Sequence, residues 1–538
     1  MAMQERATSE LRLILEQGVR LSRSLVWKMQ RRFYLEHGVK AWSQGEIPQY
    51  VTTNPVMARA YAQLYLAWLR DLAAQKSDAG AALDPSQPIY IVELGAGSGR
   101  FAYHFLLHFF DMLDRSSLRG LRVTYVMADL VETTLEFWMA HGQLQPWRDA
   151  GRLDFASFDA ESDKVLRLRS GTTLSAETVR NPMGVIANYF FDSLSQDAYR
   201  IVNGELFESL SGLSTRRHDV NHADPTDPAL LPAIELDFSQ GQPATHCYSD
   251  AALNRLLDYY ASVLPSSHLL FPCGPLACLA SLRSIARDRL FLMSADKGFH
   301  HLGDLAFGQL PELAHHGCIS MMVNYHALGQ YTTDEGGQFL ATRHRHECLD
   351  ICGFLFGLGR ENSSEIALAY EQFVELSSPD DFYVARNLLR KNPDELSLGK
   401  VLSILRGSCW DTLTYLELHP RLLELVPRTP ELLKDEIRWA AGRVWDSYYH
   451  VGERADLGFA LGLLYFNLGD YAQALERLRD SLRLHGEHAA TLYNLAMCHQ
   501  QLGQISEARS TARKSLALDP RCEPARALLL RLASRPTP

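Results

Sequence analysis

The chain has 538 residues, is 46% hydrophobic and 22% charged, and carries a formal charge of -10. This length predicts two or three domains, each with its own core, in a protein of ordinary globular composition. The modest charge argues against a general nucleic-acid binder, and no apolar run approaches the ~20 residues of a membrane span. The N-terminus lacks a secretory pattern, and nine irregularly spaced cysteines are typical of reduced thiols. We therefore expect a cytoplasmic protein whose partners are neither nucleic acid nor membrane.

Residues 1–45 are predicted to form a helical lead-in, because apolar positions recur among the basic residues of LRLILEQGVRLSRSLVWKMQRRF. We expect it to pack on a domain spanning residues 46–355. In that domain short apolar runs alternate with helical patterns, which predicts a mainly parallel sheet with crossover connections. The candidate strands are, in chain order, PIYIVEL, VTYVMAD, RLDFASF, MGVIANYFF, RLFLMSA and CISMMVNY.

An insertion is predicted within this domain, around residues 199–242. Asn203-Gly204 lies between two runs that contain apolar residues, which is a strong hairpin signal. The segment from Ser214 to Gln242 is rich in Pro, Asp and His and indicates loops or an inserted hairpin. Beyond residue 360 the pattern becomes almost wholly helical.

The C-terminal part repeats itself. Gly469 and Gly503, and likewise Ala474 and Ala508, are separated by about 34 residues, the period of tetratricopeptide repeats. Two copies are too few for stability, so the preceding helices should complete the stack. We expect a helical linker with partial repeats at 356–450, then repeats and a capping helix, Glu523 to Ala533, within 451–538. The repeats could bind a protein or peptide in a groove, or serve self-association in a homodimer.

A glycine loop follows the first strand, in IYIVELGAGSGRF. Gly95, Gly97 and Gly99 permit a tight turn and close approach of the backbone to a ligand. No Gly-Lys-Ser/Thr follows, so a Walker loop is excluded, and the dinucleotide spacing is not met either. Glu93, two residues before the first glycine, suits a ligand with positive charge better than a pyrophosphate.

This arrangement resembles the class I S-adenosylmethionine-dependent methyltransferases, in which the acid helps to recognise the methionine ammonium group. Two further strands end in an acid, Asp129 and Asp159, which the resemblance assigns to the ribose hydroxyls and the adenine amino group. The carboxyl ends of parallel strands meet at one edge, where ligands bind in such sheets. Together the three acids predict a site for S-adenosyl-L-methionine, with S-adenosyl-L-homocysteine as its product.

The fourth strand leads into Asn188-Tyr-Phe-Phe-Asp-Ser-Leu194, which resembles a motif of the MidA-like family. That family includes the mitochondrial complex I assembly factor that methylates a protein arginine. The hairpin after this motif, around Asn203-Gly204, and the segment Gln49 to Gln63, before the first strand, are similar to family segments as well. The chain departs from the family at Tyr189, where the family has glutamate, and at Ser195, where it has proline. These departures put arginine methylation in doubt.

The resemblance implies a Rossmann-like seven-stranded α/β methyltransferase domain, followed by an all-α tetratricopeptide-repeat domain. Residues implied for catalysis are Asn188, Tyr189 and Asp192, and those for substrate are Tyr50, Thr52 and Asp192. The residues implied for the cofactor are Glu93, Gly95, Ala96, Gly97, Gly99, Arg100, Asp129, Leu130, Asp159, Ala160 and Asn188. Phe190 and Phe191 are interpreted as core.

We hypothesise a methyltransferase that acts on a protein or peptide side chain, arginine being one candidate, with the repeats recruiting a substrate or partner. The alternatives are a small-molecule methyltransferase whose repeats dimerise the chain, and an adaptor that binds cofactor without catalysis. A zinc site at His344, His346, Cys348 and Cys352 is not favoured, because the spacing matches no standard knuckle.

Overall fold

A computed structural model describes residues 12–43, 47, 49–77, 80, 81, 83–216, 224–389 and 393–533. The chain divides into two compact units, Met1–Thr53 with Met57–Asp381 and Asn54–Val56 with Phe382–Pro538. The boundary therefore follows Asp381, whereas the sequence predicts one near residue 355. Parts of the predicted N-terminal lead-in and of the 214–242 segment lie outside the described residues.

The first unit is built around a nine-stranded mixed sheet with the order β19-β20-β14-β9-β4-β5-β6-β7-β8. The strands β6, β5, β4, β9 and β14 run parallel, β20 runs antiparallel to β14, and β19 runs antiparallel to β20. Apart from the small edge strands β7 and β8, this is the seven-stranded order of the class I methyltransferase fold. The bounds are β4 Ile89–Leu94, β5 Val123–Asp129, β6 Leu153–Ser157, β7 Leu166–Leu168, β8 Thr173–Leu174, β9 Met183–Asn188, β14 Leu290–Asp296, β19 Gln338–Leu340 and β20 Asp350–Leu355.

Helices cover both faces of this sheet. Buried residues of α8, α9 and α11 join one core cluster with Val92 of β4 and Val185 of β9. On the other face, Tyr65 of α4 packs edge-on against Phe105 of α5, with ring centroids 5.8 Å apart. Phe105 stacks in turn on Tyr125 of β5. Side chains of successive strand residues point to opposite faces, so the fully buried strands supply both cores.

The helices associated with the first unit are α1 Leu25–His37, α2 Lys40–Ser43, α3 Tyr50–Thr53, α4 Pro55–Ala74, α5 Arg100–Arg115, α6 Glu132–Ala140, α7 Gln145–Asp149, α8 Ala251–Val263, α9 Cys273–Ile285, α10 Leu302–Leu305, α11 Tyr325–Asp334, α12 Ser364–Tyr370 and α13 Pro379–Leu389. The last of these crosses the boundary between the units. No described helix combines the length and the apolarity that crossing a membrane requires.

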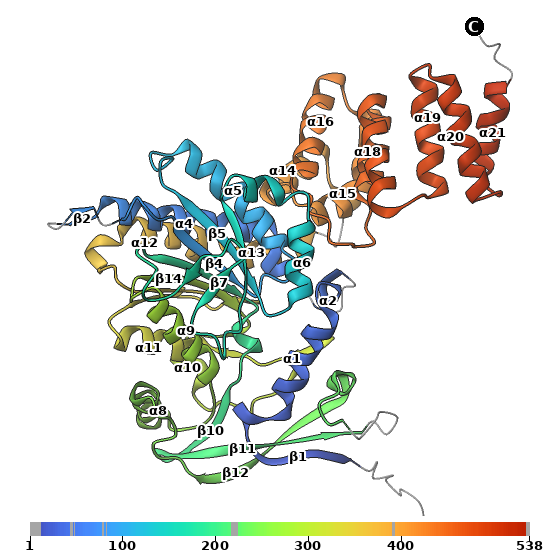
Figure 1. Ribbon diagram of the computed structural model, residues 1–538. Helices are drawn as coiled ribbons and strands as arrows, with labels where there is room; N and C mark the ends of the chain where they lie inside the picture. The colour runs from blue at the N-terminus through green and yellow to red at the C-terminus, as the bar shows by residue number, and fades with distance from the viewer. Residues whose placement is uncertain are drawn as a thin grey trace, which may run out of the picture. The chain divides into compact units, whose positions relative to one another are not determined.

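A second, antiparallel sheet confirms one prediction and corrects another (Figure 1). Its strands are β1 Leu13–Arg20, β10 Asp197–Val202, β11 Glu205–Thr215, β12 Ile234–Pro243 and β13 Ser266–Phe271. The hairpin at Asn203-Gly204 is confirmed, with positive φ at both residues (51° and 83°). The helical prediction for residues 13–20 is wrong, because this segment pairs along the edge of β11, and tertiary pairing overrides a local helical period.

The strand predicted for CISMMVNY is also corrected, because it does not join the main sheet. Its two halves form β17 Cys318–Ser320, paired with β16 Ala314–His316, and β18 Val323–Asn324, paired with β15 Gly298–Phe299. The antiparallel strand of the main sheet is instead β20, in the apolar segment around Cys352. Periodicity alone does not tell which of two short apolar runs occupies a sheet. A short hairpin outside the sheet, β2 Lys76–Ser77 with β3 Gly80–Ala81, completes the strands described.

The second unit is helical, as predicted. Its helices are α14 Leu398–Gly407, α15 Thr412–Leu425, α16 Glu431–Asp446, α17 Leu457–Asn467, α18 Tyr471–His485, α19 Ala489–Gln501, α20 Ile505–Leu518 and α21 Glu523–Ala533. The glycines Gly469 and Gly503 have φ values of 77° and 75° in the two equivalent turns. Ala474 and Ala508 are fully buried, and a Cβ at Gly462 would lie 2.6 Å from Leu478 Cγ. Small residues thus stand where the paired helices meet.

Candidate functional site

A cavity of about 240 Å³ lies at the carboxyl ends of the central parallel strands. Its volume is close to the lower end of ligand pockets, ~300 Å³. Glu93 near the end of β4, Asp129 at the end of β5 and Asp159 two residues beyond β6 all line it. The structure thus places the three predicted acids around one cavity.

The glycine turn forms part of the cavity wall. Gly95, Gly97 and Gly99 all have positive φ (61°, 52° and 77°), a conformation that L-residues with side chains rarely adopt. The Gly97 N–H donates to Asp129 Oδ2 at 3.1 Å, and its carbonyl accepts from Trp138 Nε1 at 3.0 Å. A Cβ at Gly97 would lie 2.9 Å from Trp42 Cζ2. The turn is thus fixed on both sides and leaves no room for a side chain.

Glu93 is buried at the cavity wall, with 5% of its surface exposed. Tyr125 Oη donates a hydrogen bond to its Oε2 at 2.8 Å. Burial raises the pKa of Glu93 to about 8, and this bond only partly offsets the effect. The carboxyl group is therefore largely neutral at pH 7 and would ionise readily beside a ligand cation.

Asp129 organises the turn as well as the cavity. Besides Gly97, its carboxylate accepts the Val131 N–H at 3.0 Å. Burial raises the pKa of Asp129 to about 6, while these backbone bonds act in the opposite direction. Because two amides depend on this carboxylate, its role combines positioning of the loop with any contact to a ligand.

Asp159 is already engaged. Its Oδ2 forms an ion pair with Arg31 of α1 at 2.7 Å, and its Oδ1 accepts the Glu161 N–H at 3.1 Å. The pKa of Asp159 is lowered, because its hydrogen bonds and the Arg31 charge outweigh the cost of burial. Both carboxylate oxygens retain acceptor capacity.

Most of the other predicted site residues line the same cavity. They are Thr52, Gly95, Ala96, Gly97, Leu130, Ala160, Asn188, Tyr189 and Asp192. Gly99, Arg100 and Tyr50 are not among the lining residues. Gly99 instead caps the N-terminus of α5 in the left-handed conformation. Arg100 and Tyr50 are the first residues of α5 and α3.

Asn188, at the end of β9, presents a donor. Tyr61 Oη donates to its Oδ1 at 2.9 Å, which fixes the orientation of the amide. Its buried Nδ2 has no partner among the described residues. The neighbouring Tyr189 has a positive φ of 46°, and its N–H donates to the Ala295 carbonyl at 2.9 Å. This strained connection turns the chain sharply where β9 meets the cavity.

Asp192 and Asp296 form a pair of buried acids beyond this strand. Asp296 is fully buried, and its Oδ2 accepts the backbone N–H groups of residues 190–192 at 3.0–3.4 Å. Burial and the nearby Asp192 charge raise the pKa of Asp296 well above its ordinary value. Burial also raises the pKa of Asp192 to about 6. Of the two carboxyl groups, burial and the Asp192 charge thus favour protonation of Asp296. Phe191 is fully buried as predicted, whereas Phe190 lies partly buried against Gly95.

Sequence reasoning missed the contribution of α1, for which only packing on the following domain is predicted. Trp27, Gln30, Arg31 and Tyr34 all line the cavity. Their spacing places them on one face of a helix, so a face of mixed aromatic and polar residues was the available signal. Lys297, His316 and Ser320 also line the cavity. Lys297 lies between β14 and β15, and His316 and Ser320 end the short strands β16 and β17, outside the main sheet.

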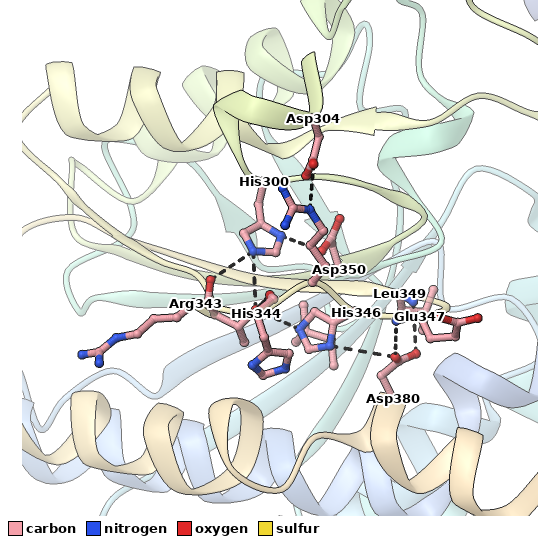
Figure 2. Close-up of polar contacts among 12 residues, drawn as sticks. His300, Asp304, Arg343, His344, His346, Glu347, Leu349, Asp350 and Asp380 are labelled. Carbon is pink, nitrogen blue, oxygen red and sulfur yellow. Dashed lines mark hydrogen bonds and ion pairs between the residues drawn. The ribbon is translucent and has the colours of Figure 1, made fainter. Parts of the chain in front are cut away.

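The histidines around residue 345 belong to a different network (Figure 2). His300 lies between Asp350 Oδ1 (2.6 Å from Nδ1) and the Thr342 carbonyl (3.0 Å from Nε2). Asp380 accepts the backbone N–H groups of residues 347–349 at 2.9–3.3 Å. The Asp380 carboxylate thus fixes the backbone of residues 347–349. Within the described ranges, no group of three or more His, Cys, Asp or Glu side chains is placed to hold a metal ion.

Comparison with known proteins gives one sequence match and several structural similarities. Residues 455–521 match the tetratricopeptide repeat family model, which confirms the predicted repeats in that segment. No curated protein matches the chain.

Three solved structures are similar in part. A likely methyl transferase from Burkholderia thailandensis, bound to S-adenosyl-homocysteine, is 14% identical, and the match covers 60% of this chain and 73% of that one (TM-score 0.36). A tetratricopeptide repeat protein of Thermus thermophilus is 19% identical, covering 32% of this chain and 90% of its own (TM-score 0.22). The CMeT domain of the citrinin polyketide synthase is 11% identical, covering 51% of this chain and 48% of its own (TM-score 0.24).

Proposed function

We propose that this protein is an S-adenosylmethionine-dependent methyltransferase. The observation that carries the proposal is the convergence of Glu93, Asp129 and Asp159 on one cavity beside a glycine turn with positive φ. Ligands of open α/β sheets bind at this edge of the sheet. Acids on three adjacent strands suit a ligand that offers a cation, a diol and an amino group in sequence.

The residues present fit this cofactor. Glu93, held neutral by burial, would ionise against the ammonium group of the methionine moiety, because a nearby cation favours the charged form. Asp129 would accept hydrogen bonds from the ribose hydroxyls, and Asp159 would accept from the adenine amino group. Gly97 would let the backbone approach the ligand closely. When bound, the cofactor supplies an electrophilic methyl group on a sulfonium.

The chain's own contribution to transfer is mainly positioning. Holding a nucleophile against the methyl carbon removes much of the entropic part of the barrier. Asn188 Nδ2, oriented by Tyr61 and without another partner among the described residues, is placed to donate a hydrogen bond to a ligand in the cavity. Asp192 supplies a buried carboxylate at the same wall, and Thr52 and Tyr189 complete the polar surface there.

We propose a protein or peptide side chain as the acceptor, with the repeats recruiting the substrate or a partner. Repeat surfaces commonly bind peptides, and the matched repeat segment supports that role. A cytoplasmic location follows from the composition and stays a prediction.

An adaptor that binds cofactor without catalysis is the second candidate. The observation that favours it is Tyr189, which stands where the resembling family has glutamate.

One experiment separates the two. The full chain is titrated with S-adenosylhomocysteine by calorimetry, and is then incubated with methyl-labelled S-adenosylmethionine and cell extract. A methyltransferase binds the ligand and labels an acceptor, and the Gly97→Val variant does neither. Binding without any label transfer would support the adaptor instead, and the lack of binding would refute both.

A further inference from the structure

Three cavity residues have no part in the proposed cofactor contacts, and they come together from distant segments. Asp192 lies in the short turn after β9, His316 ends β16, and Ser320 ends β17. In the antiparallel pair β16–β17, His316 lies opposite Cys318 and Ser320 lies opposite Ala314, so the two residues are diagonal neighbours on the same face. All three line the cavity.

A single hydroxyl connects the carboxylate to the imidazole. Ser320 Oγ lies 2.9 Å from His316 Nε2. The same side chain hydrogen-bonds the Asp192 carboxylate and holds its pKa down, as does Ser193, whose Oγ donates to Asp192 Oδ1 at 3.0 Å. A serine hydroxyl both donates and accepts, so it can pass a proton between a carboxylate and an imidazole.

The connection leads from the interior toward solvent. Asp192 is 7% exposed, His316 is half-buried, and both neighbours of His316 in the sequence are exposed. Burial lowers the pKa of His316, and the nearby Lys297 and His315 act in the same direction. His316 is therefore a neutral proton acceptor at pH 7.

We propose that Asp192, Ser320 and His316 form a proton relay, which removes the proton of an uncharged protic acceptor, such as a hydroxyl group, as that group is methylated. This inference rests on the proposed function. The new bond joins the acceptor oxygen to the methyl carbon while the carbon–sulfur bond of the sulfonium donor breaks, and that electron pair stays on sulfur. The acceptor's proton goes to Asp192, and the relay carries a proton through Ser320 to His316 Nε2.

The charges around the relay argue for an uncharged acceptor. Lys297 lines the same cavity, and among the described residues it forms no ion pair. Its charge favours the ionised form of Asp192 and the neutral form of His316. A guanidinium or ammonium group would be repelled by this cation, and Asp296 is not among the residues that line the cavity. Tyr34 and Cys318, the other titratable groups that face Asp192, are neutral at pH 7.

The first test needs no substrate. The titration of His316 is followed by NMR in the ¹³C-histidine-labelled full chain, with His316→Asn used to assign the signal. Asp192→Asn removes an anion, so we expect it to lower the pKa of His316 by about 1. In a Ser320→Ala background the same substitution should shift the pKa much less. Ser193→Ala is the matched control, because it removes a hydrogen bond to Asp192 and leaves the link to His316. An unchanged His316 titration in Asp192→Asn would overturn the relay.

The second test concerns transfer. His316→Asn and Ser320→Ala should lower kcat at least ~10-fold without changing the affinity for S-adenosylhomocysteine, and His315→Asn should match the wild type. Mass spectrometry of labelled acceptors should find the methyl group on a hydroxyl or another uncharged group. Methylarginine would overturn the inference and leave the methyltransferase standing. Cofactor binding without any transfer would refute both. Equal rates in His316→Asn and His315→Asn would also overturn the relay.

Discussion

The two ends of the cavity differ in how the chain builds them. The end proposed to bind the cofactor, here called the cofactor end, uses three strands that lie side by side in the sheet, with an acid at or near the end of each. The end proposed to receive the acceptor, here called the acceptor end, combines Asn188 and Asp192 with Lys297, His316 and Ser320, which lie more than a hundred residues later. The parallel strands of the main sheet thus place acids at one edge, whereas the acceptor end also uses short strands and connections that lie outside that sheet. Substitutions at four residues of the cofactor end test whether this end binds the cofactor.

Gly97→Val should have the largest effect on binding. Valine disfavours the φ of 52° and would place its Cβ 2.9 Å from Trp42. We expect the affinity for S-adenosylhomocysteine to fall more than ~100-fold by calorimetry, because the strain and the lost space together exceed ~2.7 kcal/mol. Gly151→Val is the matched control, since Gly151 has a φ of 67° and nothing within 4 Å of its Cβ position. Equal losses of affinity in both variants would show that backbone strain, and not the site, explains the effect.

Asp129→Asn should weaken binding by ~10-fold or more. The amide retains the shape of the side chain but is a weaker acceptor than a carboxylate for ribose hydroxyls and for the Gly97 and Val131 amides. We expect some loss of thermal stability as well, because both amides are buried. Asp154→Asn, on β6 outside the cavity lining, serves as the control. An unchanged affinity in a folded Asp129→Asn variant would argue against the ribose contact.

Glu93 should make ligand binding depend on pH. With its pKa raised to about 8 in the free protein, the carboxyl must lose a proton to face an ammonium group. The affinity for S-adenosylhomocysteine should therefore rise between pH 6 and 8, by at most ~10-fold per pH unit, and level off above pH 8. Calorimetry in two buffers of different ionisation enthalpy should detect proton release at pH 7. Glu93→Gln should abolish the release, and a pH-independent affinity in the wild type would contradict this role.

Arg31→Met should have the smallest effect. The ion pair with Asp159 is partly exposed, at 42% and 18% of the two side chains, and such pairs contribute at most ~1 kcal/mol. We expect thermal unfolding to change by no more than that, and the affinity for S-adenosylhomocysteine to change less than ~5-fold. A loss as large as that of Gly97→Val would mean that Arg31 itself holds the ligand.

The sequence predicted the cofactor end because its signals are local. Strand boundaries at Leu94 and Asp129 coincide with the predicted ones, and a glycine turn after a buried strand has few alternative structures. The prediction failed where tertiary pairing decides. Residues 13–20 form a strand only because β11 offers an edge, and residues 318–324 lie outside the main sheet because β20 takes the place beside β14.

The acceptor end could be predicted only in part. Asn188 and Asp192 belong to a recognisable motif. His316 and Ser320 come together through the β16–β17 pair, which the sequence pattern does not predict. The engagement of Asp159 by Arg31 was likewise hidden, because the two residues lie on elements that are distant in the sequence. Contacts of this kind depend on the packing of α1 over the sheet edge.

A crystal structure of the full chain with S-adenosylhomocysteine tests the central claim most directly. The account predicts the ribose hydroxyls within hydrogen-bonding distance of Asp129, the amino group of the homocysteine moiety next to Glu93, and the adenine beside Asp159. A ligand bound away from these three carboxylates, or a chain that takes up no ligand at saturating concentration, would contradict it.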